Sequence, residues 1–323
     1  GPKNQATKMS TRKETIIEYL KKGKTIAEAL DDLDLPEAAY KYLRKSDASF
    51  RETVDRLRLM RTADGSKAVR DNMPTFQDFC MEYLDTELFT HHLQWIDLLE
   101  GREPRDLHSS QVYQPGEPET VLVNTPPEHA KSTTITMNYL TYRICEDPNI
   151  RIIVVSKTHE MAKKFLRGIK DRLAGQGETY RKLQIDFAPE GGFNANSASW
   201  TADSIYVSGE MRDSGEKDPT VQALGIRGHI YGSRADLIVM DDCVDMGNAH
   251  EFSKQIDWIQ NQVLNRLSYP GGKLLLVGTR LAPVDLYSEI QKDEYYGVTL
   301  KWTIPLDSLP DCLGVLKITD CED

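Results

Sequence analysis

The chain has 323 residues, with 50 acidic side chains against 40 Lys and Arg, a formal net charge of −10 and 39% hydrophobic residues. At about 150 residues per domain this length favours two domains, and the composition excludes a disordered or fibrous protein. No apolar run reaches the roughly 18 residues that a membrane helix needs. The five cysteines are scattered without zinc or disulfide spacing, which is typical of a reduced, cytosolic protein. The acidic balance excludes a uniformly polyanion-binding surface, so any nucleic-acid contact needs a local basic patch.

Residues 1–61 are predicted to form a small helical module. Capping and spacing signals place helices at 12–22, 26–30, 36–44 and 48–61, and Thr25 with Glu28 forms a capping box at the second. Two helices joined by a tight turn, the latter carrying Lys41, Arg44 and Lys45, are the layout of a helix-turn-helix. The segment resembles helix-turn-helix modules of phage and transposase proteins, which implies DNA contact through these three side chains. An accessory bundle that contacts a partner protein is the alternative, because acidic residues nearly match basic ones here.

A polar linker is predicted at 62–72, followed by an α/β domain at 73–323. Short apolar, often β-branched runs lie at 120–124, 150–156, 204–208, 236–241 and 273–278, and helical patterns lie at 132–146, 160–173 and 251–267. Such alternation predicts a parallel sheet buried on both faces by helices. The segment 176–215 is rich in Gly, Asn and Ser, which favours loops or a local hairpin.

A strand followed by a turn and a helix that opens with Lys-Ser-Thr predicts a phosphate-binding loop. In such a loop, backbone amides and the helix N-terminus face the anion, the Lys neutralises phosphate charge and the hydroxyl binds Mg²⁺. Two positions that are usually Gly are Thr125 and Ala130 here, and Glu128 adds a negative charge. An ordinary helix cap is the alternative. The candidate nucleotide-binding residues are Thr125, Pro126, Pro127, Glu128, His129, Ala130, Lys131, Ser132 and Thr133.

Two further strands end in polar side chains that would meet this loop at one edge of a parallel sheet. The strand 236–241 ends in Asp241 and Asp242, of which one can hold Mg²⁺ and the other can orient the attacking water. The strand 273–278 is followed by Thr279, which is placed to sense the γ-phosphate. Arg280 comes next and is expected either to contact a phosphate or to form an ion pair within its own loop. Acidic residues at an exposed strand end are the alternative for the first pair.

Four segments together resemble the ATPase domain of tailed-phage large terminases over roughly 76–305. They read HHLQWIDLL, PPEHAKST, SRADLIVMDDCVD and LNRLSYPGGKLLLVGTRLAPVDLYSEI. The resemblance implies an α/β fold of the additional-strand, RecA-like P-loop NTPase type. It implies these roles: Lys131 and Ser132 on phosphates and Mg²⁺, Asp241 as the Walker B magnesium residue, Asp242 as the catalytic carboxylate, Thr279 as the coupling residue, and Gln94 and Trp95 near the adenine.

The resemblance also implies a function: a Mg²⁺-dependent ATPase that translocates double-stranded viral DNA into a procapsid. Its partners would be DNA, the portal protein and procapsid, the small terminase subunit and further copies in a ring, in the host cytoplasm with no membrane contact. Arg227 is the leading candidate for an arginine finger acting on a neighbouring subunit and Arg234 the second, with an ordinary loop contact as the alternative. The terminase nuclease domain is expected to be absent. A helicase-like remodelling ATPase and a nucleotide-dependent DNA-binding switch are the alternative functions.

Overall fold

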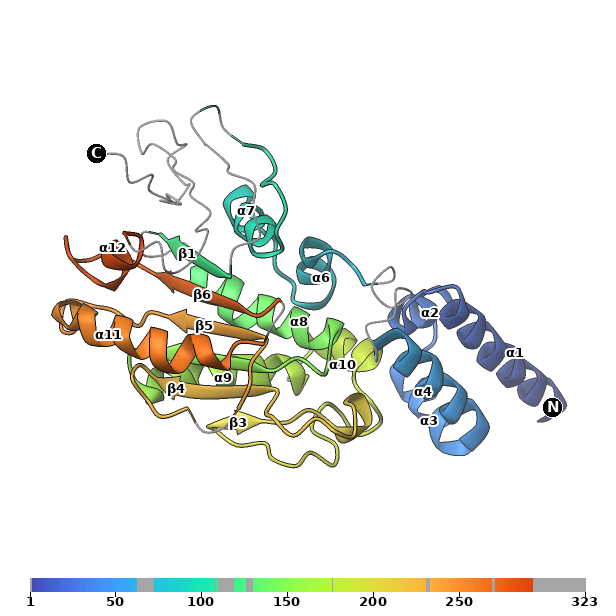
Figure 1. Ribbon diagram of the computed structural model, residues 1–323. Coiled ribbons are helices and arrows are strands. Elements are labelled where there is room, and N and C mark those ends of the chain that lie inside the picture. Colours follow the sequence, from blue (N-terminus) through green and yellow to red (C-terminus); the bar gives the residue numbers. More distant parts are fainter. Residues whose placement is uncertain are drawn as a thin grey trace.

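The computed structural model describes residues 2–62, 73–107, 109, 119–125, 130–175, 177–230, 233–268 and 271–292. Figure 1 shows a group of N-terminal helices at one end of a larger α/β body. The elements are α1 Pro2–Lys21, α2 Ile26–Asp32, α3 Glu37–Ser46, α4 Ala48–Thr62, α6 Phe76–Tyr83, α7 Thr90–Leu99, β1 Thr120–Asn124, η1 Ser132–Tyr139, α8 Leu140–Glu146, β2 Ile152–Ser156, α9 His159–Leu173, α10 Arg181–Phe187, β3 Ser204–Ile205, η2 Gly209–Met211, β4 Val221–Gly225, β5 Leu237–Asp241, η3 Ala249–Glu251, α11 Phe252–Trp258, η4 Ile259–Val263, η5 Leu264–Arg266, β6 Lys273–Gly278 and α12 Leu286–Ile290.

The strands in the described part of the chain form one sheet of six strands, in the order β1-β6-β5-β2-β4-β3. The neighbouring strands β1 and β6, β6 and β5, β5 and β2, and β2 and β4 are parallel. Only the two-residue strand β3 is antiparallel to its neighbour, β4. The predicted mostly parallel sheet flanked by helices is therefore confirmed. Strands that are neighbours in the sheet are not consecutive in the chain. Segments far apart in sequence therefore meet at the carboxyl ends of β1, β6 and β5.

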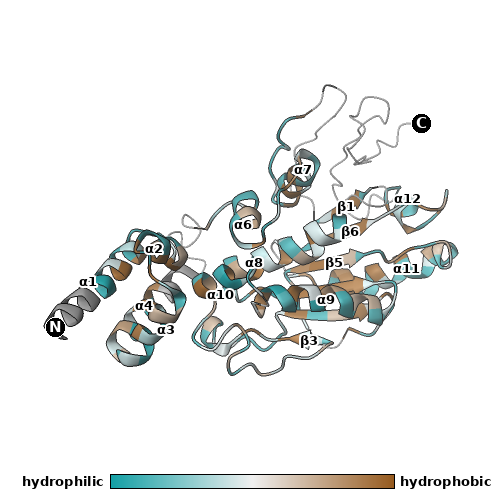
Figure 2. Ribbon diagram, turned by 180° about the vertical axis from the view of Figure 1, so that it is seen from behind, coloured by the Kyte–Doolittle hydropathy of each residue, from teal (hydrophilic) through white to brown (hydrophobic). Residues whose placement is uncertain are grey.

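Successive strand residues pack into two different cores, one on each face of the sheet. Val121 and Val123 of β1 join the cluster that contains α6, α7, α8 and α9. Leu122 between them joins the cluster with α11, η4 and α12 on the other face. Because both faces are covered, the strands are apolar at nearly every position, and they appear brown between the helices in Figure 2.

Two elements of the sheet domain differ from the sequence prediction. The strand β4, Val221–Gly225, was not predicted, and α10, Arg181–Phe187, lies in the segment predicted to be loops or a hairpin. The first turn of α10 has no side-chain cap hydrogen bond; it is held by packing of Leu183 and Phe187 into the core. The predicted helix 132–146 is present, but its first half, η1, is wound as a π-helix.

The N-terminal helices α1–α4 share a core of their own. The predicted capping box is present: Thr25 Oγ1 accepts from the Glu28 amide at 3.0 Å, and Glu28 Oε2 accepts from the Thr25 amide at 2.8 Å. Ile185 of α10 completes this core from the sheet domain. Beside it, buried Asp186 accepts hydrogen bonds from the Ala27 amide at 2.8 Å and from the Tyr83 hydroxyl at 2.7 Å. One carboxylate thus joins α2, α6 and α10.

The three predicted DNA-contact residues on α3 have different surroundings. Arg44 is not available to DNA: its side chain is 7% exposed and pairs with Asp55 at 2.8 Å and with Glu190 at 3.8 Å. The two carboxylates compensate the charge of this buried guanidinium, which would be costly without partners. Lys41 is exposed and pairs with Glu37 at 2.7 Å, and Lys45 is exposed. DNA contact by these two lysines stays a prediction.

Three other sequence expectations concern the cysteines, membrane-spanning helices and the linker. Cys80, Cys145 and Cys243 are free and buried. None of the described helices combines the length and apolar character needed to cross a bilayer. The predicted linker, except for Thr62 at the end of α4, lies outside the described residues.

Candidate functional site

The candidate site lies where the carboxyl ends of β1, β6 and β5 meet. In the sheet register Asn124 is paired with Gly278, and Asp241 with Val277. The segments that follow these strands are therefore neighbours, although Ser132 and Asp241 are 109 residues apart in the sequence. This edge is where open α/β sheets bind ligands.

Asp241 is the centre of a hydroxyl–carboxylate cluster. Ser132 Oγ donates to Asp241 Oδ1 at 3.0 Å, and Thr136 Oγ1 donates to Asp241 Oδ2 at 2.5 Å. The Asp241 side chain is completely buried. Both hydroxyls come from η1, where residues four positions apart lie on one side of the helix.

Burial raises the pKa of Asp241 to about 7, because desolvation disfavours its charged form and Asp242 adds a like charge. The hydrogen bonds from Thr136 and Ser132 and the charge of Lys131 act in the opposite direction. In the described ranges no group of three or more His, Cys, Asp or Glu side chains is arranged to hold a metal ion. A single carboxylate with a neighbouring hydroxyl instead fits a cation that takes its other ligands from phosphates and water.

Lys131 and Asp242 form the outer part of the same cluster. Lys131 Nζ lies 3.6 Å from Asp242 Oδ1, and the side chains are 11% and 40% exposed, respectively. Asp242 leaves β5 in a left-handed conformation, with φ +50°, while its amide donates to the Val277 carbonyl at 3.0 Å. The turn thus places this carboxylate beside Lys131, and its charge also acts on the buried Asp241.

Thr279 connects the ends of β6 and β1. Its hydroxyl donates to the Thr125 carbonyl at 2.9 Å, and the Thr125 amide donates to the Gly278 carbonyl at 3.1 Å. Behind it, a Cβ atom on Gly278 would lie 2.6 Å from Cζ of the fully buried Tyr287. Only glycine therefore allows α12 to pack against this strand end.

The predicted phosphate loop is described only at its ends. Pro126, Pro127, Glu128 and His129 lie outside the described residues. Ala130 has a left-handed backbone, φ +54°, at the position where glycine is usual in such loops. Lys131 and Ser132 follow it at the start of the helix, and Thr133 is exposed.

The side chains of Gln94 and Trp95 have partners within the chain. Trp95 is 1% exposed and belongs to the core that covers one face of the sheet. Gln94 Nε2 donates to the Arg105 carbonyl at 2.9 Å and to that of Asp106 at 3.4 Å, which fixes the loop after α7. Their observed roles are core packing and loop anchoring, and contact with an adenine stays a prediction.

The candidate arginines lie at different places along the sheet. Arg227 follows β4 at the same edge as Lys131; its side chain is 43% exposed and pairs loosely with Glu251 at 3.5 Å. Its backbone has φ +63°. Arg234 precedes β5 and therefore lies towards the opposite edge. Arg280 donates to the Pro283 carbonyl at 2.8 Å, a contact within its own loop.

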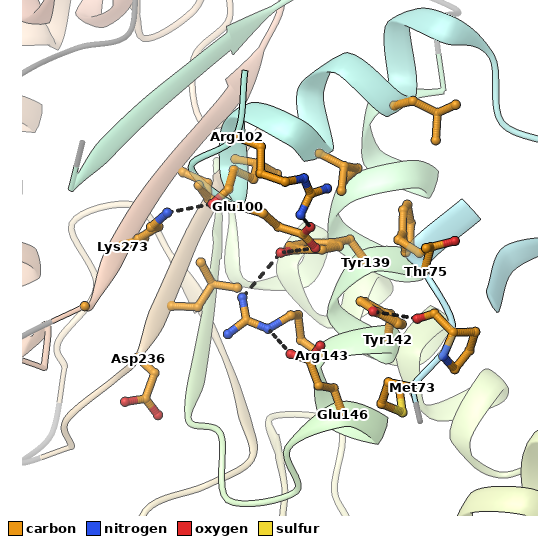
Figure 3. A pocket seen from close by; sticks show the side chains of 18 of the residues that line it. Met73, Thr75, Glu100, Arg102, Tyr139, Tyr142, Arg143, Glu146, Asp236 and Lys273 are labelled. Carbon is orange, nitrogen blue, oxygen red and sulfur yellow. Dashed lines mark hydrogen bonds and ion pairs between the residues drawn. The ribbon is translucent and has the colours of Figure 1, made fainter. Parts of the chain in front are cut away.

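A cavity of about 610 Å³ opens elsewhere, between α6, α7, α8 and the amino ends of β5 and β6 (Figure 3). Its polar side chains bind one another: Arg143 Nε lies 3.4 Å from Glu146 Oε1, and Arg143 Nη1 donates to the Tyr139 hydroxyl at 3.4 Å. Lys273 Nζ donates to the Leu99 carbonyl at 2.6 Å. The cavity is therefore separate from the hydroxyl–carboxylate cluster, which lies at the other edge of the sheet.

Two features of the site edge were missed by sequence reasoning. Thr136 was not singled out, although its position four residues after Ser132 on a predicted helix was a usable signal. The ion pair of Lys157, after β2, with Asp245, after β5, has a Nζ to Oδ2 distance of 2.5 Å. It had no local signal, because its partners are 88 residues apart.

Comparisons with known proteins find similarity to phage terminases. No family model matches the chain. The large terminase subunit of Enterobacteria phage T3 is 25% identical over 174 residues, covering 52% of this chain and 27% of that protein. The crystal structure of the HK97 bacteriophage large terminase aligns with a TM-score of 0.36 and 14% identity, over 56% of this chain and 33% of that one. The chain thus spans about a third or less of the length of these proteins. The sequence similarity agrees with the resemblance seen in the motifs: part of the chain is similar to a bacteriophage terminase large subunit.

Proposed function

We propose that the chain contains the ATPase of a viral DNA-packaging motor, which hydrolyses ATP with Mg²⁺ and drives double-stranded DNA into a procapsid. The observation that carries the proposal is the convergence of Lys131, Ser132, Asp241 and Asp242 at one sheet edge, from segments more than 100 residues apart. This is the set of groups that a P-loop NTPase of the RecA-like type needs. The terminase relationship supplies the substrate class, DNA, and the partners expected from the sequence.

Each residue would have a separate task in hydrolysis. Ser132 and Asp241 would hold Mg²⁺, which neutralises negative charge on the β- and γ-phosphates when bound. The triphosphate would take Lys131 from its ion pair with Asp242, because phosphate oxygens carry more charge than one carboxylate. Asp242 would then be free to orient the attacking water, and Thr279 would register the loss of the γ-phosphate through its bond to Thr125.

We further propose that Arg227 acts on the site of a neighbouring copy in the ring. It follows β4, which one strand, β2, separates from β5 in the same sheet, and neighbouring strands are about 4.8 Å apart. Its partial exposure and its loose pair with Glu251 leave it free to exchange partners. An Arg supplied in this way would stabilise charge on the transferred phosphoryl group.

The test is steady-state Mg-ATP hydrolysis as a function of protein concentration, with and without duplex DNA. A rate per chain that rises with concentration, and that falls by about 100-fold or more in Asp242→Asn, is expected. Exposed Asp257 on α11 provides the matched control, and Asp257→Asn should keep the wild-type rate. A rate that is insensitive to Asp242→Asn would reject the proposal.

A nucleotide-dependent DNA-binding switch is the second candidate. The ion pair between Lys131 and Asp242 favours it, because the catalytic carboxylate is neutralised in the nucleotide-free protein. Tight ATP binding without turnover, in assembled and DNA-bound protein, would support the switch over the motor. A helicase-like remodelling ATPase instead predicts ATP-dependent separation of DNA strands by the same protein.

A further inference from the structure

Thr136 lies one helical turn beyond the residues that the phosphate-loop pattern identifies. Its side chain is completely buried, and its hydroxyl donates to Asp241 Oδ2 at 2.5 Å. The oxygen on the other side of the same carboxylate, Oδ1, accepts from Ser132 at 3.0 Å. The two oxygens of Asp241 are therefore held by two hydroxyls of different accessibility, since Ser132 is only partly buried.

Both hydroxyls come from the first half of the helix, η1. Residues Ser132–Tyr139 form a π-helix, and the Leu140 amide at its end donates to the Ile135 carbonyl five residues earlier. A π-helical segment is uncommon and frequently marks a functional site. Within it, two hydroxyls four positions apart, a spacing that puts them on one side of the helix, contact the same carboxylate.

We infer that Thr136 is a positioning residue for the divalent-cation site, which deepens and rests on the proposed ATPase function. Its hydroxyl fixes the carboxylate plane of Asp241, so that Oδ1 stays directed towards Ser132 and the opening of the site. The bond to Oδ2 lies on the interior side and does not compete with a ligand at Oδ1. The Thr136 bond therefore holds Asp241 both when Ser132 donates to Oδ1 and when the Ser132 oxygen binds a cation instead.

The experiment compares Thr136→Val with Thr136→Ser and with Thr141→Val in the full chain. Thr141 is the matched control: it is equally buried in the following helix, but its hydroxyl donates to the Met137 carbonyl at 2.7 Å. Binding of a fluorescent, non-hydrolysable ATP analogue is titrated with Mg²⁺, and thermal unfolding is recorded for each variant. Both readouts are independent of turnover.

Thr136→Val is expected to raise the Mg²⁺ concentration for half-maximal analogue binding by about 10-fold or more, as loss of a residue that orients a metal ligand typically does. Its affinity for the analogue without Mg²⁺ should match that of Thr141→Val, and Thr136→Ser should restore the wild-type Mg²⁺ dependence. If Thr136→Val does not fold, Thr136→Ala removes the same hydroxyl and answers the same question.

Two outcomes overturn the inference in distinguishable ways. Equal Mg²⁺ dependence of Thr136→Val and Thr141→Val, in a protein whose analogue binding is lost in Lys131→Ala, rejects the role of Thr136 alone. Wild-type protein that does not bind the analogue at all rejects the proposed ATPase and the inference with it.

Discussion

Asp186 is expected to hold the N-terminal helices on the sheet domain, and replacing it tests that arrangement. It is 2% exposed, and its two carboxylate oxygens accept from the Ala27 amide at 2.8 Å and from the Tyr83 hydroxyl at 2.7 Å. Ala27 is in the first turn of α2, where backbone amides lack partners within the helix and favour a negative charge. The carboxylate therefore satisfies a helix end and a buried hydroxyl at once.

The expected loss follows from these two bonds. A hydrogen bond to a charged group contributes about 1.5–3 kcal/mol, so the loss of two of them in Asp186→Ala should lower the free energy of unfolding by roughly 3–6 kcal/mol. Asp186→Asn keeps the shape and can still pair with both groups, and charge-assisted bonds are about twice as strong as neutral ones. It should therefore lose about half as much.

Urea unfolding followed by tryptophan fluorescence measures these differences. Glu178→Ala, at a position 97% exposed just before α10, is the control and should change the free energy of unfolding by less than about 0.5 kcal/mol. A double-mutant cycle of Asp186→Ala with Tyr83→Phe should give a coupling energy of about 1–2 kcal/mol. An Asp186→Ala loss as small as that of Glu178→Ala would refute the reasoning, because a buried carboxylate with these two partners cannot be removed without cost.

Three further predictions concern the candidate site. Because burial raises the pKa of Asp241 from 3.8 to about 7, the folded protein binds a proton that the unfolded chain has lost between about pH 4 and pH 7. The free energy of unfolding of the nucleotide-free protein should therefore fall as the pH rises through this range, by a few kcal/mol at about 1.4 kcal/mol per pH unit. Asp241→Asn should flatten the profile, and parallel profiles for the two proteins would contradict the assignment. Gly278→Ala should cost about 1–3 kcal/mol by overpacking against Tyr287, as measured by thermal unfolding, and Tyr287→Leu in the same chain should recover part of the loss; an unchanged unfolding midpoint would show that the two do not pack as described. Lys131→Ala should abolish Mg-ATP hydrolysis while changing the free energy of unfolding by less than about 1 kcal/mol, since its partner Asp242 is 40% exposed; retention of normal turnover would remove Lys131 from the site.

The sequence predicted the parts of the fold whose signal is local. The strands 120–124 and 273–278 were predicted to the residue, because uninterrupted apolar runs are typical of a sheet covered on both faces. The strand β4, with the sequence VQALG, was missed because Val221 is its only β-branched residue and it ends in Gly225. Its place in the sheet comes from pairing with β2, which the sequence does not display.

The candidate site shows the same division between local and distant signals. Lys131, Ser132, Asp241 and Asp242 were found because they directly follow predicted strands or open a predicted helix. Arg44 was a candidate DNA contact because of its place on the second helix of a helix-turn-helix layout; its burial against Asp55 and Glu190 has no local sequence signal, since Glu190 is 146 residues away.

Backbone conformation at the edge of the site has a consequence for protein engineering. The described non-glycine residues with left-handed φ are Asp34, Asp85, Asp106, Ala130, Asn196, Arg227 and Asp242. Asp and Asn tolerate this conformation, whereas Ala and Arg adopt it at a cost of about 1–2 kcal/mol. A library selected for heat resistance alone would therefore be enriched in glycine at positions 130 and 227, where relief of strain is largest. Both positions follow strands that end at the sheet edge where the candidate site lies, so such a selection would trade turnover for stability unless activity is scored in the same round.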